Sequence, residues 1–187
     1  MNSLILSDTT TLEKIKLTDA EIIFETIDRN RDFLKEWLPF VEFTHGVANT
    51  KAFIKSLLEI QGPAQPETFT IWFKGNFAGL IGFKDPDIIN HRTEIGYWLD
   101  PKMQGKGIIT QAAKALTNYA FEQLGMNRIQ IRCGVGNTKS SAIPKRLGYH
   151  FESIEREGEF HLDHYIDLEV YSILKKEWAK INRCQDH

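Results

Sequence analysis

The sequence predicts an α+β fold built on a single mixed, mostly antiparallel sheet of about seven strands flanked by helices. Residues 69–84 form two strand-like runs around Gly75-Asn76, and these two residues favour the positive φ of a hairpin turn. A helical pattern over residues 105–124 then separates the strand-like runs 92–99 and 128–135. A helical crossover makes the two strands that it joins parallel neighbours, so the sheet is mixed.

The elements before the hairpin are one strand and three helices. Residues 11–17 alternate imperfectly between apolar and charged, which predicts an edge strand. A helix begins at Thr18, because Glu21 stands three residues later in capping-box position. Residues 31–41 predict a short helix that stops before Pro39, since proline disfavours helical geometry in the residue before it.

The remaining elements follow from helical spacing and from turn residues. Residues 50–60 predict a helix that Gly62-Pro63 terminates, and residues 137–147 predict another helix with a glycine cap. Residues 155–162 are charged and contain a glycine, which indicates a turn, and residues 165–174 alternate as a final strand.

Composition predicts one domain over residues 1–187, with a flexible N-terminus at 1–9 and a flexible C-terminal tail at 180–187. With 42% hydrophobic residues, the chain can bury a sizeable core. A net charge of -2 gives no basic field for nucleic acid or an anionic membrane surface. Two cysteines form neither a disulfide framework nor a paired zinc pattern, and no leader or apolar run of roughly 18 residues is present, so we expect a cytoplasmic protein.

A glycine-rich helix start follows the strand break at Asp100-Pro101. Its backbone N–H groups are available to an anion before any side chain is considered. The dinucleotide spacing fails because Thr110 stands where the third glycine would be, and no Walker loop is present. Taken alone, Gly105 and Gly107 are also explained by a tight strand-to-helix turn.

Three stretches near this turn carry a family resemblance. Gln104-Gly105-Lys106-Gly107 resembles the coenzyme A motif of the GCN5-related N-acetyltransferase (GNAT) superfamily, with Ile109 in place of the small residue that ends the motif. Asn137-Thr138-Lys139-Ser140 and the stretch 145–149 resemble the family's Asn-x-x-Ser and Lys-x-Leu-Gly-Phe segments. The resemblance covers residues 11–178.

Residues 92–99 and 35–40 further resemble the RimL-like branch, which acetylates the N-terminal amine of ribosomal proteins. The resemblance implies a GNAT fold whose sheet is splayed between the strands ending at Leu99 and Val135. It also implies acetyl-CoA as cosubstrate, no metal, and acetyl transfer to a primary amine, first of all the N-terminal α-amine of a ribosomal protein. The residues expected to bind acetyl-CoA are Leu99, Gln104, Gly105, Lys106, Gly107, Ile108, Ile109, Thr110, Asn137 and Ser140.

The resemblance assigns three catalytic roles. Glu94 is the expected general base, since strand alternation places it on the face opposite Ile95 and a primary α-amine has a pKa near 8. The Leu99 N–H is expected to polarise the thioester carbonyl, and Ser140 is expected to protonate the leaving thiolate.

Each assignment has a purely structural alternative. Glu94 could pair with Arg92 or Lys84 on a solvated face of the sheet. Ser140 could satisfy backbone N–H groups at its helix start, and Asn137 could cap the same helix while also binding the pantetheine arm. A solvated surface position would equally explain Lys106.

Other clusters carry weaker expectations. Trp37, Phe40 and Tyr97 are expected to wall the acceptor site, although the tryptophan and the phenylalanine, with Phe43 and His45, could instead be core. His161-x-x-His164 with Asp163 suggests a metal, but no third ligand is near in sequence and a solvated loop is the expectation. Cys184-x-x-His187 is weaker still.

Alternative functions remain open from the sequence. The acceptor could be a polyamine or an aminoglycoside, and the fold could serve as a non-catalytic acyl-CoA sensor. A dinucleotide-dependent oxidoreductase would require measured nicotinamide or flavin binding. We expect neither nucleic acid nor membrane as a partner, and a homo-oligomer is possible.

Overall fold

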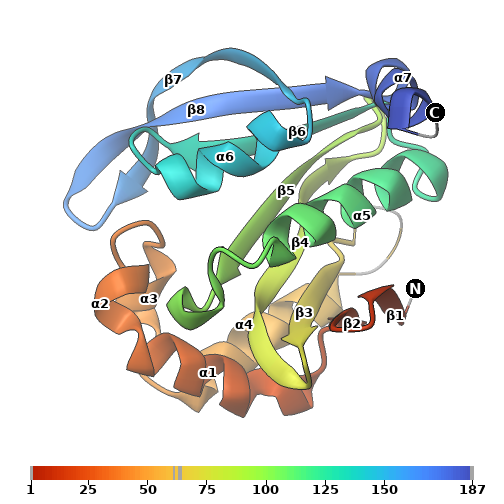
Figure 1. Cartoon of the computed structure of the whole chain (residues 1–187). Helices are drawn as coiled ribbons and strands as arrows, with labels where there is room; N and C mark the ends of the chain where they lie inside the picture. Colours follow the sequence, from red (N-terminus) through yellow and green to blue (C-terminus); the bar gives the residue numbers. More distant parts are fainter. Residues whose placement is uncertain (1, 61, 63–64, 186–187) are drawn as a thin grey trace.

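The computed structural model describes residues 2–60, 62 and 65–185 of the chain. In these residues one sheet of eight strands has the order β1-β2-β3-β4-β5-β6-β8-β7 (Figure 1). The strands are β1 (Ser3–Ser7), β2 (Thr10–Lys14), β3 (Thr68–Phe73), β4 (Asn76–Asp87), β5 (Arg92–Leu99), β6 (Arg128–Gly134), β7 (His150–His161) and β8 (His164–Leu174). The helices are α1 (Ala20–Arg29), α2 (Arg31–Leu34), α3 (Phe40–Phe43), α4 (Val47–Glu59), α5 (Ile108–Glu122), α6 (Thr138–Arg146) and α7 (Lys175–Gln185). The predicted α+β fold is confirmed, with eight strands instead of about seven.

Apolar clusters lie on both faces of the sheet. On one face the fully buried Leu116 of α5 shares a cluster with Ile95 of β5. On the other face Ile23 of α1 and Ile54 of α4 pack with Trp98 of β5. Strand β5 therefore lies between two helical layers (Figure 1). Its alternate side chains enter different layers.

The sheet opens between its two central strands. Strands β5 and β6 pair in parallel only at Arg92↔Arg128, Thr93↔Ile129 and Glu94↔Gln130. Beyond Glu94 the two strands no longer pair and diverge (Figure 1). The predicted splay is confirmed, although β6 ends at Gly134, one residue before Val135.

The N-terminal elements differ from the prediction in two ways. Strand β1 lies inside the stretch expected to be flexible and pairs with β2, so β2 is not an edge strand. The capping box predicted from Thr18 and Glu21 is wrong, because a 3-10 turn at Leu17–Asp19 precedes α1. The Asp19 carboxylate caps this turn by accepting from the Lys16 N–H at 2.8 Å.

The next helices have different boundaries from those predicted. The single helix predicted over 31–41 is two short helices, α2 and α3, with Pro39 at the N-cap of α3. Helix α4 begins at Val47 instead of residue 50. Of its predicted terminator, Pro63 lies outside the described residues.

The hairpin between β3 and β4 is present, but its turn is one residue earlier. Lys74 and Gly75 adopt positive φ, at 51° and 75°, whereas Asn76 already begins β4. Strand β4 continues past the predicted end at Lys84 to Asp87, with an irregular register before its last pair.

The C-terminal part is more regular than predicted. Residues 155–162 are not a turn: β7 runs through them to His161, with a bulge between Glu155 and Glu159 where Glu157 has a φ of 52°. The tail expected to be flexible from residue 180 lies in helix α7 as far as Gln185.

Candidate active site

Strand β5 presents two sets of side chains to the two helical layers. Glu94 and Trp98 face the layer of α1 and α4, and Trp98 is in their apolar cluster. Ile95 and Tyr97 face α5 and α6, where the Tyr97 hydroxyl donates to the Ser140 carbonyl at 3.0 Å. The expected position of Glu94 opposite Ile95 follows from this alternation.

The backbone of β5 has free donors along the splay. The Asp100 N–H donates to the Ala78 carbonyl at 2.7 Å, and Gly79 is the register partner of Leu99. Residues of an antiparallel ladder alternate between hydrogen-bonded and non-hydrogen-bonded pairs, so the Leu99 pair is non-hydrogen-bonded. The Leu99 N–H therefore points away from β4 and into the gap toward β6.

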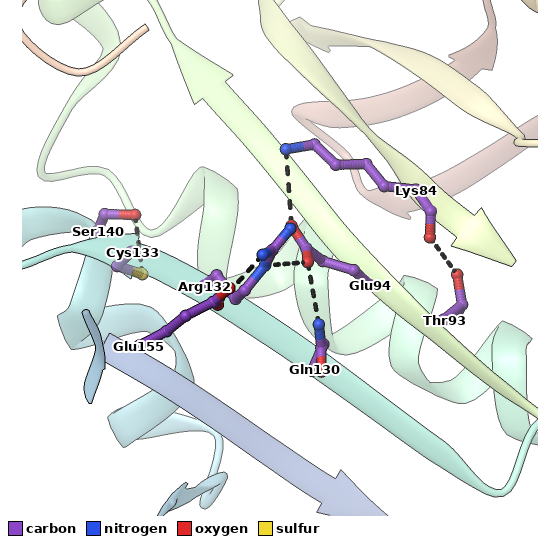
Figure 2. A network of polar contacts seen from close by, with 8 residues as sticks. All are labelled: Lys84, Thr93, Glu94, Gln130, Arg132, Cys133, Ser140 and Glu155. Atoms are coloured by element: carbon purple, nitrogen blue, oxygen red, sulfur yellow. Dashed lines mark hydrogen bonds and ion pairs between the residues drawn. The ribbon is translucent and has the colours of Figure 1, made fainter. Parts of the chain in front are cut away.

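Glu94 is buried within a network of polar side chains (Figure 2). Its Oε2 accepts from Arg132 Nε at 2.6 Å and from Gln130 Nε2 at 3.1 Å. Its Oε1 lies 3.6 Å from Lys84 Nζ. The alternative pairing with Lys84 is therefore present, whereas Arg92 pairs with Asp87. Glu94 is thus ion-paired, but it lines a cavity and does not lie on a solvated face of the sheet.

Arg132 and Gln130 are site residues that the sequence analysis missed. Both project from β6 on the face that carries Glu94, while the apolar Ile131 between them faces α5. Burial lowers the pKa of Arg132, but Glu94 and Glu155 outweigh it and raise this pKa above its ordinary value. The alternation of Gln130, Ile131 and Arg132 in the sequence was the signal that could have found them.

Ser140 points into a polar cluster at the start of α6. Asn137 caps this helix, because its Oδ1 accepts from the Ser140 N–H at 3.1 Å. The Ser140 hydroxyl is therefore not needed for capping and donates to Cys133 Sγ at 3.3 Å, with the Tyr97 hydroxyl 3.5 Å away (Figure 2 shows the serine and the cysteine).

Burial keeps this cluster protonated. It raises the pKa of the Tyr97 hydroxyl well above its ordinary value and the pKa of the Cys133 thiol to about 11. At neutral pH the Ser140 hydroxyl thus has two neutral neighbours that hold protons.

The turn before α5 has the geometry of an anion site. Gly105 and Gly107 both have a φ of 74°, in the left-handed region that favours glycine. The Gln111 N–H donates to the Gly107 carbonyl at 3.0 Å, which leaves the N–H groups of the first three helical residues, 108–110, without intrahelical partners.

Two expected phosphate contacts differ in detail. The Gln104 N–H donates to the Pro101 carbonyl at 3.3 Å and is already used. The Lys106 ammonium turns back to the Lys102 carbonyl at 2.7 Å. Lys139 of α6 instead donates to the Gln104 side chain at 2.9 Å, across the opening of the splay. The side chains of Ile108 and Ile109 are buried in the core, so they lie away from the N–H groups.

Glu94 and Ser140 both line one cavity of about 580 Å³. It runs along β5 between the layer of α1 and α4 and the start of α6. The predicted site residues that line it are Trp37, Phe40, Glu94, Tyr97, Asn137 and Ser140. Leu99 and residues 104–110 are not among its lining residues, so the glycine turn before α5 lies outside this cavity.

The predicted aromatic wall divides between the two sides of the cavity. The Trp37 ring packs against the backbone of Gly134 at the end of β6. It lies so close that a Cβ at this glycine would be 3.1 Å from the ring. Phe40 is 41% exposed, so it is not core, and it lies with Trp37 on the side of α1 and α4. Tyr97 lies on the other face, beside Ser140.

The histidine motif forms no metal site among the described residues, where no group of three or more His, Cys, Asp or Glu side chains could hold an ion. His161 is buried, and its Nε2 is 2.8 Å from the Lys35 carbonyl, which ties the hairpin of β7 and β8 to α2. His187 of the second motif lies outside the described residues.

Comparison with known proteins gives the same family from sequence and from structure. The acetyltransferase (GNAT) domain model matches residues 10–150. A putative ribosomal N-acetyltransferase of Bacillus subtilis, YdaF, is 35% identical over 173 residues, covering 90% of this chain and 92% of the relative. The ribosomal-protein-serine acetyltransferase of Escherichia coli is 27% identical and covers 89% of this chain and 93% of its own.

Solved structures share the fold. The ribosomal α-N-protein acetyltransferase RimL in complex with coenzyme A superimposes with a TM-score of 0.87 at 24% identity, covering 92% of this chain and 98% of that chain. The microcin C7 self-immunity acetyltransferase MccE, in complex with acetyl-CoA and AMP, has a TM-score of 0.85 at 27% identity and covers 90% of this chain and 94% of that chain. In the part of the chain that the structure describes, no helix is long and apolar enough to cross a bilayer.

Proposed function

This chain belongs to the GNAT acetyltransferase family as an acyltransferase that uses acetyl-CoA, and we propose that it acetylates the N-terminal α-amine of a ribosomal protein. Two relatives that match nearly the whole chain are named as ribosomal acetyltransferases. Their names support the acceptor class, and the site supports the chemistry.

The observation that carries this proposal is the unpaired edge of β5 between Glu94 and Leu99. The N–H groups of its odd-numbered residues face a gap that the parallel pairing with β6 leaves open. An extended pantetheine arm can pair with such an edge, and the N–H groups at residues 108–110 can hold its pyrophosphate. The residues present therefore fit acetyl-CoA without a metal ligand.

The Leu99 N–H has the position of an oxyanion donor in this arrangement. As the acceptor nitrogen forms its bond to the thioester carbon, negative charge develops on the carbonyl oxygen. A preorganised N–H that has no other partner stabilises that charge without reorganising. The charge disappears when the carbon–sulfur bond breaks.

Glu94 takes the proton that the acceptor amine loses. Its Oε2 is held by Arg132 and Gln130, so Oε1 is the oxygen left to accept a proton, directly or through water. Lys84, the neighbour of Oε1, is a mostly exposed side chain at 3.6 Å and can move aside. A carboxylate whose Oε2 is held by two donors and whose Oε1 faces only an exposed lysine is well positioned as a base.

Ser140 supplies the second proton transfer. Its hydroxyl gives a proton to the departing thiolate, and solvent returns one to the serine. The protonated Cys133 thiol at 3.3 Å and the neutral Tyr97 hydroxyl at 3.5 Å are the neighbours that can stabilise the serine oxygen while it lacks that proton. In the whole step a carbon–nitrogen bond forms and the carbon–sulfur bond breaks. Glu94 takes one proton from the amine, and the thiolate receives one from Ser140.

The lining of the cavity favours a peptide over a polycation. Carboxylates at the cavity are Glu94, already paired with Arg132, together with Asp85 and Glu159, and most of the acceptor half is apolar. The spermidine N(1)-acetyltransferase of Escherichia coli is 30% identical over 84 residues, only 45% of this chain. A polyamine therefore remains the comparison acceptor in the test.

The test combines an acceptor panel with two carboxylate variants. Ribosomal proteins, peptides with their N-terminal sequences, spermidine and aminoglycosides are incubated with acetyl-CoA, and products are located by mass spectrometry. For Glu94→Gln we expect kcat/KM to fall about 10²-fold or more with acetyl-CoA binding retained. Glu155→Gln is the matched control, because Glu155 also binds Arg132, at 3.2 Å, but does not line the cavity. Unchanged turnover in Glu94→Gln would remove Glu94 as the base, and acetylation of spermidine alone would replace the acceptor.

A further inference from the structure

Lys84 of β4 places an ammonium beside the proposed base. Its Nζ lies 3.6 Å from Glu94 Oε1, the carboxylate oxygen that is not held by donors from β6 (Figure 2). The lysine side chain is 59% exposed and lines the cavity, so a ligand in the cavity can reach it. The ammonium therefore stands next to the place where an acceptor amine would lose its proton.

The strands beneath Lys84 direct its side chain along the face of β5 that carries Glu94. Lys84 is the register partner of Glu94, and its carbonyl accepts from the Thr93 hydroxyl at 2.9 Å. A Cβ at Gly96 would collide with Lys84 Cε, so the lysine stem crosses β5 directly over this glycine. A larger residue at position 96 would displace the stem from the cavity side of the strand.

The ammonium of Lys84 donates no hydrogen bond to any of the residues that the structure describes. Its distance of 3.6 Å to Glu94 is an ion-pair distance, longer than an N–H···O hydrogen bond. By contrast, Lys35, Lys106 and Lys139 donate hydrogen bonds of 2.7, 2.7 and 2.9 Å. The three N–H groups of Lys84 are thus available to an oxygen atom of a ligand.

An N-terminal α-amine brings such an oxygen atom with it. The carbonyl oxygen of the first residue lies about 3 Å from the amine nitrogen, since only Cα and the carbonyl carbon separate them. This span is close to the 3.6 Å between Glu94 Oε1 and Lys84 Nζ. An amine that binds Oε1 can therefore place its own carbonyl against Nζ as the ammonium moves off the carboxylate. A polyamine has no such carbonyl, and the lysine charge repels its second cation.

We propose that Lys84 is a specificity-determining residue that donates to the carbonyl oxygen of the acceptor's first residue. The site then selects an amine that is one carbon away from a carbonyl. The proposal rests on the proposed function, because it names the residue that recognises the α-amine end of the acceptor. It requires that an amine farther from its carbonyl, such as the ε-amine of a lysine, gain nothing from Lys84.

The test uses two isomeric peptides that begin with alanine or with β-alanine. β-Alanine moves the carbonyl one carbon farther from the amine and changes neither the composition nor the number of charges. We expect Lys84→Met to lower kcat/KM about tenfold for the alanine peptide, the effect of one hydrogen bond from a charged donor, and less than threefold for the β-alanine peptide. Each acceptor is compared with itself in the wild type, so the different basicity of the two amines cancels.

The methionine substitution keeps an unbranched stem over Gly96 and removes only the ammonium of a mostly exposed residue. The melting temperature should therefore stay close to that of the wild type. Arg92→Met is the matched control, because it removes a positive charge two residues before Glu94. Arg92 pairs with Asp87 and does not line the cavity, so both peptides should keep their wild-type rates.

The outcomes separate this inference from the proposed function. An equal loss for both peptides in Lys84→Met would mean that the ammonium acts only through the charge of Glu94, and it would overturn the carbonyl contact while α-amine acetylation stands. Unchanged rates for both peptides would overturn the contact as well. If neither peptide is acetylated and only polyamines are, the α-amine acceptor falls and the inference falls with it.

Discussion

Replacing Leu99 with proline is expected to slow acetyl transfer far more than it weakens the fold. Proline inside a strand usually removes a ladder hydrogen bond. Leu99 is in a non-hydrogen-bonded pair with Gly79, so its N–H faces the splay and no bond to β4 is lost. Proline is tolerated where the strand N–H lacks a strand partner, and the substitution thus deletes only the N–H that we propose as the oxyanion donor.

The expected magnitudes are well separated. Loss of one oxyanion donor costs about 10²–10³ in kcat, or roughly 3–4 kcal/mol of transition-state stabilisation. The Leu99 side chain is only partly buried against the core, so shortening it costs about 1 kcal/mol of folding free energy. A catalytic loss of the larger size therefore cannot come from the packing change.

The assay compares Leu99→Pro with Leu99→Ala at saturating acetyl-CoA. Leu99→Ala removes at least as much of the packed side chain but keeps the N–H, so its kcat should remain within a few-fold of the wild type. Melting temperatures and acetyl-CoA affinity are measured on both variants. A folded Leu99→Pro that binds acetyl-CoA and turns over within about threefold of Leu99→Ala would refute the assignment of this N–H to the oxyanion.

Two further predictions concern electrostatics. Arg128 binds Glu152 through two hydrogen bonds, of 2.7 and 2.6 Å, and these bonds lower the pKa of Glu152 from 4.5 to about 2. A carboxyl whose pKa is lower in the folded state stabilises the fold at pH values above its unfolded-state pKa, and this stabilisation is lost as pH falls through its folded-state pKa. The melting temperature of the wild type should therefore drop more steeply between about pH 5 and 2 than that of Arg128→Met. Parallel curves would contradict this. Lys139→Met should raise KM for acetyl-CoA about three- to tenfold, because Lys139 donates to Gln104 beside the turn proposed to bind the pyrophosphate. The effect on S-acetylpantetheine, which lacks the pyrophosphate, should be smaller. Lys106→Met is the control, since that ammonium turns back to Lys102, and an equal loss in both lysine variants would count against the assignment.

The central part of the fold was predictable from the sequence, because there the periodicity of apolar residues and the turn residues match the strand and the helix that form. Strand β5 has the predicted bounds, and helix α5 begins at the glycine turn that the motif indicates. Strand β7 was mistaken for a turn over residues 155–162 because it is an edge strand with both faces largely exposed, so it lacks apolar alternation. Strand β1 has only five residues and gives too short a pattern to separate from a flexible terminus.

The sequence was enough to propose candidate site residues where a motif or strand alternation points to a position, but not where the contact depends on long-range register. Glu94 and Ser140 follow from the motif and from strand parity. The Arg132 contact joins residues 38 apart in the chain and exists because parallel pairing stops at Gln130, a fact of tertiary structure.

Strand parity also places the proposed base, Glu94, and the proposed acid, Ser140, on different faces of the sheet, from which both could act on one thioester. Even-numbered positions of β5 face α1 and α4, which places Glu94 with the acceptor wall. Odd-numbered positions face α5 and α6, which places Tyr97 beside Ser140. The N–H groups of those same odd positions point along the sheet into the gap, because the even positions pair with β4. A carbonyl held by these N–H groups then has the base on one side of the sheet and the acid on the other, so the amine proton and the thiolate proton travel separate routes.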